Sequence, residues 1–342
     1  VALCLILLQV PIRQTAFLII HPTAEVREMA TLYFHICIWG APAMLGLYGL
    51  SGWFIGMQNS RIPMYIAITQ NIVNIIASLS FVCFFKMKVE GVAFGTLIAQ
   101  YAGFIMGLVL WMSRYGKLKK YILWKGVLQK EAMMRFFQVN RDIFLRTLCL
   151  VTVTLFFTSA GASQGEIILA VNTLLMQLFT LFSYVMDGFA YAGEALSGRY
   201  IGARNRKAFT NTTRHLFIWG GWLAAFFTLV YALGGNAFLG LLTDNKDVVS
   251  AAGTYFYWAL AIPVAGIAAF IWDGIFIGAT ATRGMLASMA IAAICFFVVY
   301  YGLRPVLGNH ALWLAFLVYL AMRGVVQTLL SPKIIKENFT QP

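Results

Sequence analysis

Charged residues are scarce in this sequence, and acidic residues are the scarcest of them. Charged side chains make up 11% of the 342 residues, and Asp and Glu together number only 12. A chain of this length has too little polar surface to cover a soluble globule, so a soluble protein is excluded. Hydrophobic residues make up 61% of the chain and the mean hydropathy is +0.80. These values predict an integral membrane protein.

Cysteine and histidine are too few and too scattered to build a metal or disulfide site. The 5 cysteines stand alone in apolar runs, and none of the 4 histidines has a second ligand at helical spacing. A phosphate-binding loop of the GxxxxGK[ST] type is absent. Clustered acids that would hold a catalytic metal are absent too. We therefore expect no His/Cys metal site, no cofactor, no direct use of ATP and no enzymatic activity.

The apolar residues form runs of the length that a membrane-spanning helix needs, about 20 residues. We expect an all-α protein with about ten spanning helices, in the runs near 1–12, 32–57, 64–86, 91–113, 142–161, 166–193, 213–233, 254–279, 284–303 and 310–331. The first run is short and the chain opens inside it on Val1. This opening predicts that the start of the chain is cut.

The net charge of +13 follows membrane topology and does not require nucleic acid. When residues 114–141 are assigned to the cytoplasm and the spans alternate from there, most Lys and Arg fall on the cytoplasmic side. This asymmetry is typical of multi-pass membrane proteins. We expect a location in the inner (plasma) membrane, with residues 114–141 and the C-terminus cytoplasmic, lipid around the chain and no nucleic-acid partner.

An internal repeat divides the chain into two halves. Glu25 to Arg61 matches Asp247 to Arg283 without a gap, and Gly52 pairs with Gly274, 222 residues further on. By the span count both copies enter the membrane in the same sense, so the repeat is parallel. We expect two pseudo-symmetric helical bundles: an incomplete N-terminal bundle over 1–113, a cytoplasmic interfacial linker over 114–141, and a C-terminal bundle over 142–342.

Polar residues form stripes along two of the predicted helices. Spacings of three and four place the first stripe on one face of the 166–198 segment: Gln177, Thr180, Tyr184, Asp187, Tyr191 and Glu194. The second stripe lies on 64–86 and is uncharged: Gln70, Asn71, Asn74 and Ser78. Such a stripe faces either a cavity or another polar helix. Gln70, Asn74, Ser78, Gln177, Tyr184 and Tyr191 are therefore candidates for contact with a transported solute, with helix packing as the alternative.

Asp187, Glu194 and Asp273 are the acids inside apolar runs, where a charge is costly and usually serves transport of ions or protons. Asp273 is our first candidate for an ion or proton relay and Asp187 the second, with Na⁺ binding as one form of the relay. The alternative is a structural ion pair. Arg146 lies at comparable depth by span counting, so it is a candidate partner or gate.

Three stretches resemble the multidrug and toxic compound extrusion (MATE) transporters, in particular their DinF-like branch. They are NRDIFLRTL at 140–148, DGFAYAGEALSGRYIGARN at 187–205 and DGIFIGAT at 273–280. The resemblance implies two six-helix bundles around a central cavity, and places the ten runs as helices three to twelve. It also implies that a cation or proton gradient drives export of organic compounds.

The same resemblance marks Asp273 as the membrane carboxylate of the second bundle, and Asp187 and Glu194 as acids of the eighth helix. In the first bundle the branch has Asn followed four residues later by Asp. This chain has Asn74 but then Ser78. The resemblance thus leaves two alternatives open: coupling through the second bundle, or loss of ordinary coupling.

We therefore expect a monomeric secondary antiporter that exports organic, cationic or amphipathic small molecules in exchange for H⁺ or Na⁺ by alternating access. Two alternatives stay open. A flippase for a lipid-linked precursor needs several inward cations, and only Arg146 qualifies by sequence. A membrane-embedded enzyme needs clustered acids or a His and Asp site.

Overall fold

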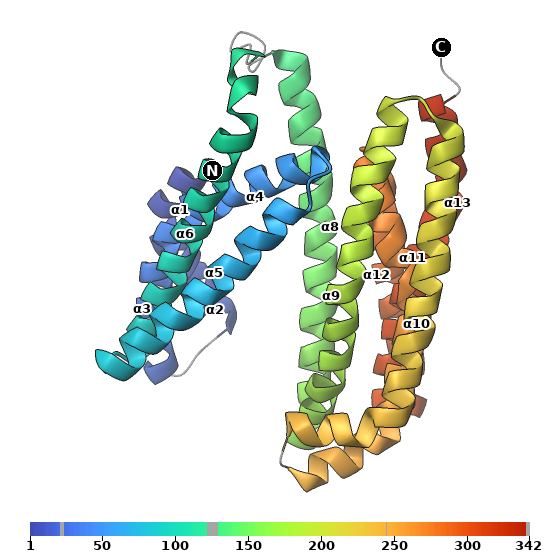
Figure 1. Cartoon of the computed structure of the whole chain (residues 1–342). Coiled ribbons are helices and arrows are strands. Elements are labelled where there is room, and N and C mark those ends of the chain that lie inside the picture. The colour runs from blue at the N-terminus through green and yellow to red at the C-terminus, as the bar shows by residue number, and fades with distance from the viewer. Residues whose placement is uncertain (21–23, 122–128, 244, 340–342) are drawn as a thin grey trace. The chain divides into compact units, whose positions relative to one another are not determined.

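The computed structural model describes residues 1–20, 24–121, 129–243 and 245–339, and every element in these ranges is helical (Figure 1). Within these ranges, 9 helices are long and apolar enough to cross a membrane, the first from Arg27 to Gly56. The run predicted near 1–12 falls on α1 (Ala2–Leu7) and α2 (Gln9–Ile20), which are not among them. The all-α membrane fold is confirmed.

The chain forms two compact units, Val1–Leu123 and Trp124–Pro342. The predicted linker at 114–141 covers the end of α6, a 3₁₀ turn η3 (Gly116–Tyr121) and the first turns of α8. Its residues 122–128 lie outside the described ranges. α8 continues without a break from Lys130 into the first span of the second unit.

Unit 1 packs its helices around a small aromatic core. Its elements after α2 are α3 (Ala24–Cys37), η1 (Ile38–Gly40), α4 (Ala41–Gly56), α5 (Arg61–Leu79), the π-helical turn η2 (Ser80–Phe84) and α6 (Val89–Tyr115). Phe54 and Ile62 are almost fully buried, and Trp53 and Tyr115 pack against them. The Trp53 and Tyr115 ring centroids lie 4.7 Å apart, edge to face.

Unit 2 is a bundle of six long helices joined by short connections, which make sequence neighbours antiparallel (Figure 1). They are α8 (Lys130–Ala162), α9 (Glu166–Gly202), α10 (Arg206–Leu242), α11 (Lys246–Gly278), α12 (Thr282–Leu307) and α13 (Asn309–Phe339). Asparagine side chains cap the N-termini of α10 and α11. Asn205 Oδ1 accepts a hydrogen bond from the Ala208 amide at 3.0 Å, and Asn245 Oδ1 accepts one from the Asp247 amide at 3.0 Å.

The helix ends reproduce the internal repeat. α4 ends at Gly56 and α11 at Gly278, which are 222 residues apart, the offset found in the sequence. α5 and α12 begin at Arg61 and Thr282, within one residue of the same offset. The helix boundaries therefore follow the repeat seen in the sequence, while the parallel symmetry of the two halves stays a prediction.

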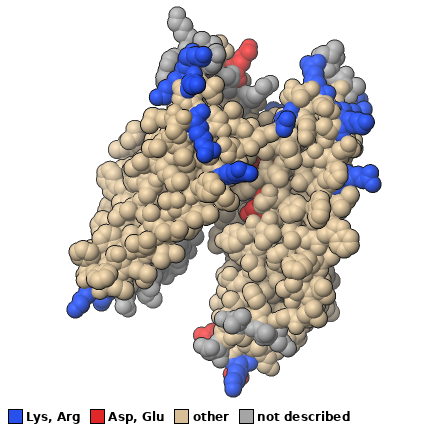
Figure 2. Space-filling model, in the orientation of Figure 1, with Lys and Arg blue, Asp and Glu red and all other residues tan. Residues whose placement is uncertain are grey.

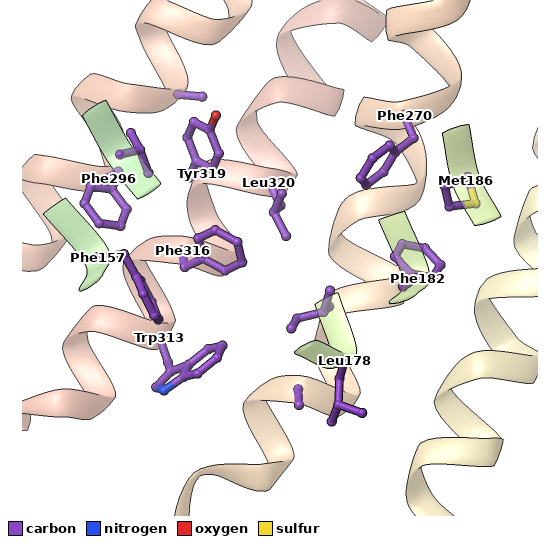
Figure 3. Close-up of a cluster of buried hydrophobic side chains, with 14 of the residues drawn as sticks. Phe157, Leu178, Phe182, Met186, Phe270, Phe296, Trp313, Phe316, Tyr319 and Leu320 are labelled. Atoms are coloured by element: carbon purple, nitrogen blue, oxygen red, sulfur yellow. The ribbon is translucent and has the colours of Figure 1, made fainter. Parts of the chain in front are cut away.

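A cluster of buried aromatic and aliphatic side chains fixes the helices of unit 2 (Figure 3). The Phe157 ring of α8 meets the Trp313 ring of α13 edge to face, with centroids 5.0 Å apart. Phe182 of α9 meets Phe270 of α11 at 5.9 Å in the same geometry. Burial of side chains of this size is the main stabilising contribution. The polar residues described below are therefore held by a rigid apolar frame.

Two glycines let α9 and α11 approach at backbone distance. A Cβ added at Gly274 would lie 2.6 Å from the carbonyl carbon of Ala190, and one at Gly278 would lie 3.0 Å from that of Glu194. Both distances are too short for a real side chain, so only glycine fits at either position. This contact sets the helix that carries Asp187 and Glu194 directly against the helix that carries Asp273.

Candidate functional site

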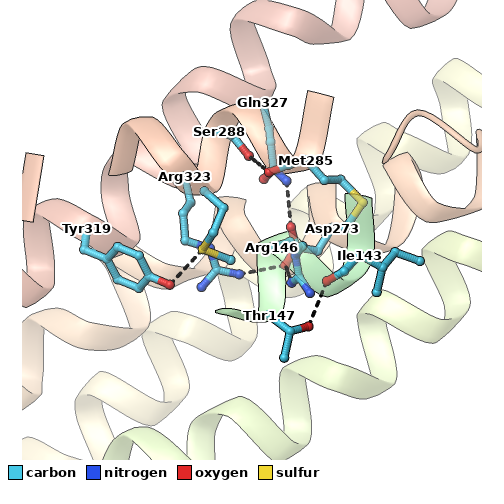
Figure 4. A network of polar contacts seen from close by, with 10 residues as sticks. Ile143, Arg146, Thr147, Asp273, Met285, Ser288, Tyr319, Arg323 and Gln327 are labelled. Carbon is cyan, nitrogen blue, oxygen red and sulfur yellow. Dashed lines mark hydrogen bonds and ion pairs between the residues drawn. The ribbon is translucent and has the colours of Figure 1, made fainter. Parts of the chain in front are cut away.

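Asp273 is the centre of a buried polar network in unit 2 (Figure 4). Its Oδ2 accepts hydrogen bonds from Nη2 of Arg146, on α8, and from Nη2 of Arg323, on α13, the latter at 2.6 Å. Its Oδ1 accepts from Nε2 of Gln327 at 2.6 Å. Three helices thus converge on one carboxylate that is only 7% exposed.

The α13 side of the network follows from helical spacing. Tyr319, Arg323 and Gln327 are four residues apart, so they share one face of the helix. The Arg323 guanidinium lies over two rings, 5.6 Å from the Tyr319 centroid and 5.9 Å from that of Phe270. The Tyr319 hydroxyl donates to Met289 Sδ at 2.8 Å. Arg323 is therefore fixed by aromatic contacts as well as by its charge.

The network has more hydrogen-bond capacity than it uses. The Nε atoms of Arg146 and Arg323 and Oε1 of Gln327 are buried, and none of the three has a hydrogen-bond partner among the residues that the structure describes. Two guanidiniums share one carboxylate, so the three groups carry a net positive charge. Buried charges are costly unless compensated, and compensation here is incomplete. The Arg146 side chain is 18% exposed, against 5% for Arg323, so Arg146 lies at the open edge of the network.

Asp187 lies on α9 beside this network without joining it. Its side chain is half-buried, and no hydrogen bond or ion pair joins it to another described residue. It interacts electrostatically with Asp273, Arg146 and Arg323. Glu194, two turns further along α9, is also half-buried, and no charged group contributes to its environment. The structure thus gathers Arg146, Asp187 and Asp273 and leaves Glu194 apart.

The other predicted residues of α9 lie on its accessible face. Gln177 is exposed, and in unit 2 Tyr184 and Tyr191 are 72% and 54% exposed. Gln177 also lines an open depression of about 620 Å³ with Thr173 and Asn245, at the end of α9 remote from Asp187. The stripe predicted from the sequence is therefore accessible over most of its length.

The uncharged stripe of unit 1 faces a neighbouring helix. Asn74 Nδ2 donates to Thr96 Oγ1 of α6 at 3.3 Å. Ser78 packs against Gly95 of the same helix, and its buried hydroxyl has no partner. Gln70 is half-buried and also faces α6. In unit 1 these three side chains therefore serve the packing of α5 on α6, while solute contact by them stays a prediction.

The sequence analysis did not identify two members of the central network, Arg323 and Gln327. Arg146 was the only inward cation expected, and the structure corrects this, because Arg323 is 4% exposed and contacts the same carboxylate. Gln327 is fully buried beside it. The spacing of Tyr319, Arg323 and Gln327 inside an apolar run was the available signal.

A second buried polar cluster lies apart from the charges. Asn172 of α9 and Asn309 of α13 exchange two amide hydrogen bonds of 2.9 Å each. Trp313 Nε1 donates to Asn172 Oδ1 at 2.9 Å. This cluster links two helices and has no ionisable member, so its role is structural. Among the described residues no three His, Cys, Asp or Glu side chains come together as a metal site would require.

Comparisons with known proteins agree on one family. The sequence model of the family described as MatE matches residues 1–79 and 143–303. The chain is 38% identical over 323 residues to DNA damage-inducible protein F of Escherichia coli strain K12, covering 93% of this chain and 69% of that protein. It is 25% identical over 292 residues to Protein DETOXIFICATION 42 of Arabidopsis thaliana, covering 84% of this chain and 55% of that one.

Among solved structures, a mutant of the Vibrio cholerae MATE transporter VcmN superposes with a TM-score of 0.88 at 16% identity. The superposition covers 99% of this chain and 77% of that structure. At this identity the likeness concerns the fold alone.

Proposed function

The chain belongs to the MatE family of multidrug and toxic compound efflux transporters, and from that premise we propose that it is a secondary antiporter. It exports organic, cationic or amphipathic solutes in exchange for H⁺ or Na⁺, by alternating access of its two bundles. The gradient is its only energy source, and it uses no cofactor. Membership agrees with the multi-pass membrane fold described above.

One observation carries the proposal: Asp187, a half-buried carboxylate with no hydrogen-bond or ion-pair partner in the described part of the chain, stands beside a buried ion-pair network in an apolar bundle. Charged groups at membrane depth are costly and mark ion or proton pathways. A cation that neutralises such a carboxylate changes the local charge balance, and the low dielectric of the surroundings strengthens that effect. Asp187, Glu194 and Asp273 are thus the candidates for the coupling group, with Arg146 as their internal counter-ion.

The accessible face of α9 is the proposed contribution of unit 2 to solute binding. Tyr184 and Tyr191 present aromatic rings on this face, and Gln177 offers an amide. A cation over an aromatic ring gains from the negative ring face. In unit 1, Gln70, Asn74 and Ser78 are the proposed solute contacts. An organic cation or an amphipathic molecule fits these groups.

The distribution of basic residues supports an orientation in the membrane. In Figure 2 most Lys and Arg side chains lie towards the two ends of the visible surface, and few charged side chains lie between them. In unit 2 many of them sit at the end where α9, α11 and α13 finish, among them Arg199, Arg204, Arg206, Lys207, Arg283, Lys333 and Lys336. We assign this end to the cytoplasm of an inner (plasma) membrane, and propose a monomer.

Transport in proteoliposomes tests the proposal. The full-length protein is reconstituted, and pH and Na⁺ gradients are imposed separately while efflux of a fluorescent organic cation is followed. We expect saturable flux that depends on one of the two gradients and collapses with an ionophore that dissipates it. Flux that ignores both gradients would refute antiport. Vesicles with heat-denatured protein are the control for leakage.

A flippase for a lipid-linked precursor is the second candidate, favoured by the second buried guanidinium, Arg323. Arg146 and Arg323 together offer two guanidinium groups that could donate hydrogen bonds to a pyrophosphate group. Both already contact Asp273, however, which leaves little free charge for a pyrophosphate. Translocation of a lipid-linked pyrophosphate across the same vesicles, without organic-cation flux, would favour this candidate over the antiporter.

A further inference from the structure

We propose that Asp187 is the carboxylate that exchanges the coupling cation, and that the Arg146 guanidinium competes with this cation for it. The inference rests on the proposed antiport and names the group that carries it. Asp273 then has a different role, as the permanent acceptor that holds the guanidiniums in place. The argument has three parts, which concern Asp273, Asp187 and Arg146 in turn.

Asp273 has no room for a further cation. Oδ2 already accepts from two guanidiniums, and Oδ1 accepts from the Gln327 amide. A proton or Na⁺ at Asp273 would place a third positive charge around one carboxylate that is 7% exposed. Such a cluster is strongly disfavoured in a low dielectric. A cation binds here only if one of the guanidiniums leaves.

Asp187 meets the requirements that Asp273 does not. Its side chain is half-buried on the accessible face of α9, so a small ion reaches it without moving the core. It has no hydrogen-bond or ion-pair partner among the described residues. It also lies within the field of Arg146, Arg323 and Asp273. A cation bound at Asp187 therefore changes the electrostatic environment of charged residues on α8, α11 and α13.

Arg146 is the member of the network that is able to change partner. It lies at the exposed edge, while Arg323 is stacked over two rings. Its Nε–H is buried and lacks an acceptor. In the structure Arg146 contacts Asp273. A charged Asp187 competes with Asp273 for this guanidinium, and a cation that neutralises Asp187 removes that competition. Cation binding thus decides whether α8 is tied to α9 or to α11.

Glu194 is the other candidate for the exchanging carboxylate on the accessible face of α9. Its carboxylate is half-buried, but burial alone shapes its environment and no charged group contributes. A cation at Glu194 would leave the guanidinium contacts unchanged. Coupling requires that the bound cation alter contacts to a neighbouring helix. Asp187 meets this requirement and Glu194 does not.

Labelling with dicyclohexylcarbodiimide tests the assignment without a transport assay. This reagent modifies accessible protonated carboxyl groups in membrane proteins, and modified positions are located by mass spectrometry of peptides. In the full-length protein we expect modification of Asp187 and not of Asp273. Modification of Asp187 falls when Na⁺ is added or when the pH is raised, since either change removes the protonated form. Arg146→Gln increases modification of Asp187, because the competing cation is gone.

Three results would overturn the assignment: modification of Asp273 in place of Asp187, modification of Glu194 alone, or modification of Asp187 that responds to neither Na⁺ nor pH. In vesicles, Asp187→Asn loses gradient-dependent flux, whereas Asp247→Asn, the same change at an exposed acid of α11, retains it. Full gradient-dependent flux in Asp187→Asn also overturns the inference. If the unaltered protein shows no such flux but Asp187 is labelled and protected as expected, the proposed antiport fails and the cation site stands.

Discussion

Asp273 on α11 and Arg323 on α13 are joined by a contact of 2.6 Å between Oδ2 and Nη2, and both residues are buried. The contact links two helices across 50 residues of sequence. Arg146 reaches the same oxygen from α8. A single carboxylate therefore compensates two guanidiniums and ties three helices of the second unit together. The stability of that unit and the charge balance of the site depend on the same atoms.

Asp273→Asn is expected to destabilise the protein more than Arg323→Gln. The first change leaves the buried Arg323 and the partly buried Arg146 without a carboxylate, and removal of one partner from a buried pair costs about 3–5 kcal/mol. The second leaves Asp273 paired with Arg146, so its cost is smaller. Thermal unfolding in detergent measures both. Lys333→Gln is the control on α13, because its ion pair with Glu337 is exposed and such pairs contribute at most about 1 kcal/mol.

Equal unfolding temperatures for Asp273→Asn and Lys333→Gln would contradict the central position of this carboxylate. A larger loss for Arg323→Gln than for Asp273→Asn would show that Arg323 stabilises the bundle mainly through its contacts with Phe270 and Tyr319.

Gly274→Ala is expected to separate α9 from α11. The added methyl group meets the backbone of Ala190, which has no flexible end that could move aside. Overpacking of this kind costs about 1–3 kcal/mol. Gly253→Ala is the matched control on α11, since nothing lies within 4 Å of the added Cβ there. Thermal unfolding distinguishes the two variants, and equal stability of both would contradict the backbone contact.

The sequence was sufficient to predict the architecture because hydrophobic length and the repeat are local or periodic signals. An offset of 222 residues, seen in pairs such as Gly52 and Gly274, returns in the helix ends Gly56 and Gly278. Acids inside apolar runs were visible for the same reason. Asp187 and Asp273 each interrupt a hydrophobic stretch, and no tertiary information is needed to see them.

The partners of those acids were harder to predict, because they depend on which helix faces meet. Arg323 and Gln327 reach Asp273 only once α13 packs on α11. Likewise, the spacing of Asn74 and Ser78 predicted one polar face but not that it lies against α6. Helical periodicity identifies a face, whereas the choice of neighbour is a property of the packed bundle.

Asn172→Asp is expected to destabilise unit 2 through its polar core. The change replaces the amide donor to Asn309 Oδ1 with a second acceptor, in a position that is 2% exposed. A buried acceptor left without its donor costs about 1–3 kcal/mol, and more if it is charged. Asn211→Asp makes the same chemical change at an exposed position. Thermal unfolding that fails to separate the two would contradict the Asn172–Asn309 pairing.

Two neighbouring aromatic residues of α9 should respond differently to truncation, because they point to opposite environments. Phe182 is fully buried and Tyr184 is 72% exposed. Phe182→Ala removes a core ring and is expected to cost about 3–5 kcal/mol of stability.

Tyr184→Ala removes an accessible ring instead, so it leaves the unfolding temperature nearly unchanged. It is expected to raise the KM for an organic cation, because a cation–π contact contributes about 0.5–2 kcal/mol. Tyr184→Phe keeps the ring and should restore the KM. An unchanged KM in Tyr184→Ala would remove this face of α9 from solute binding, whereas a higher KM in both Tyr184 variants would assign the effect to the hydroxyl group rather than to the ring.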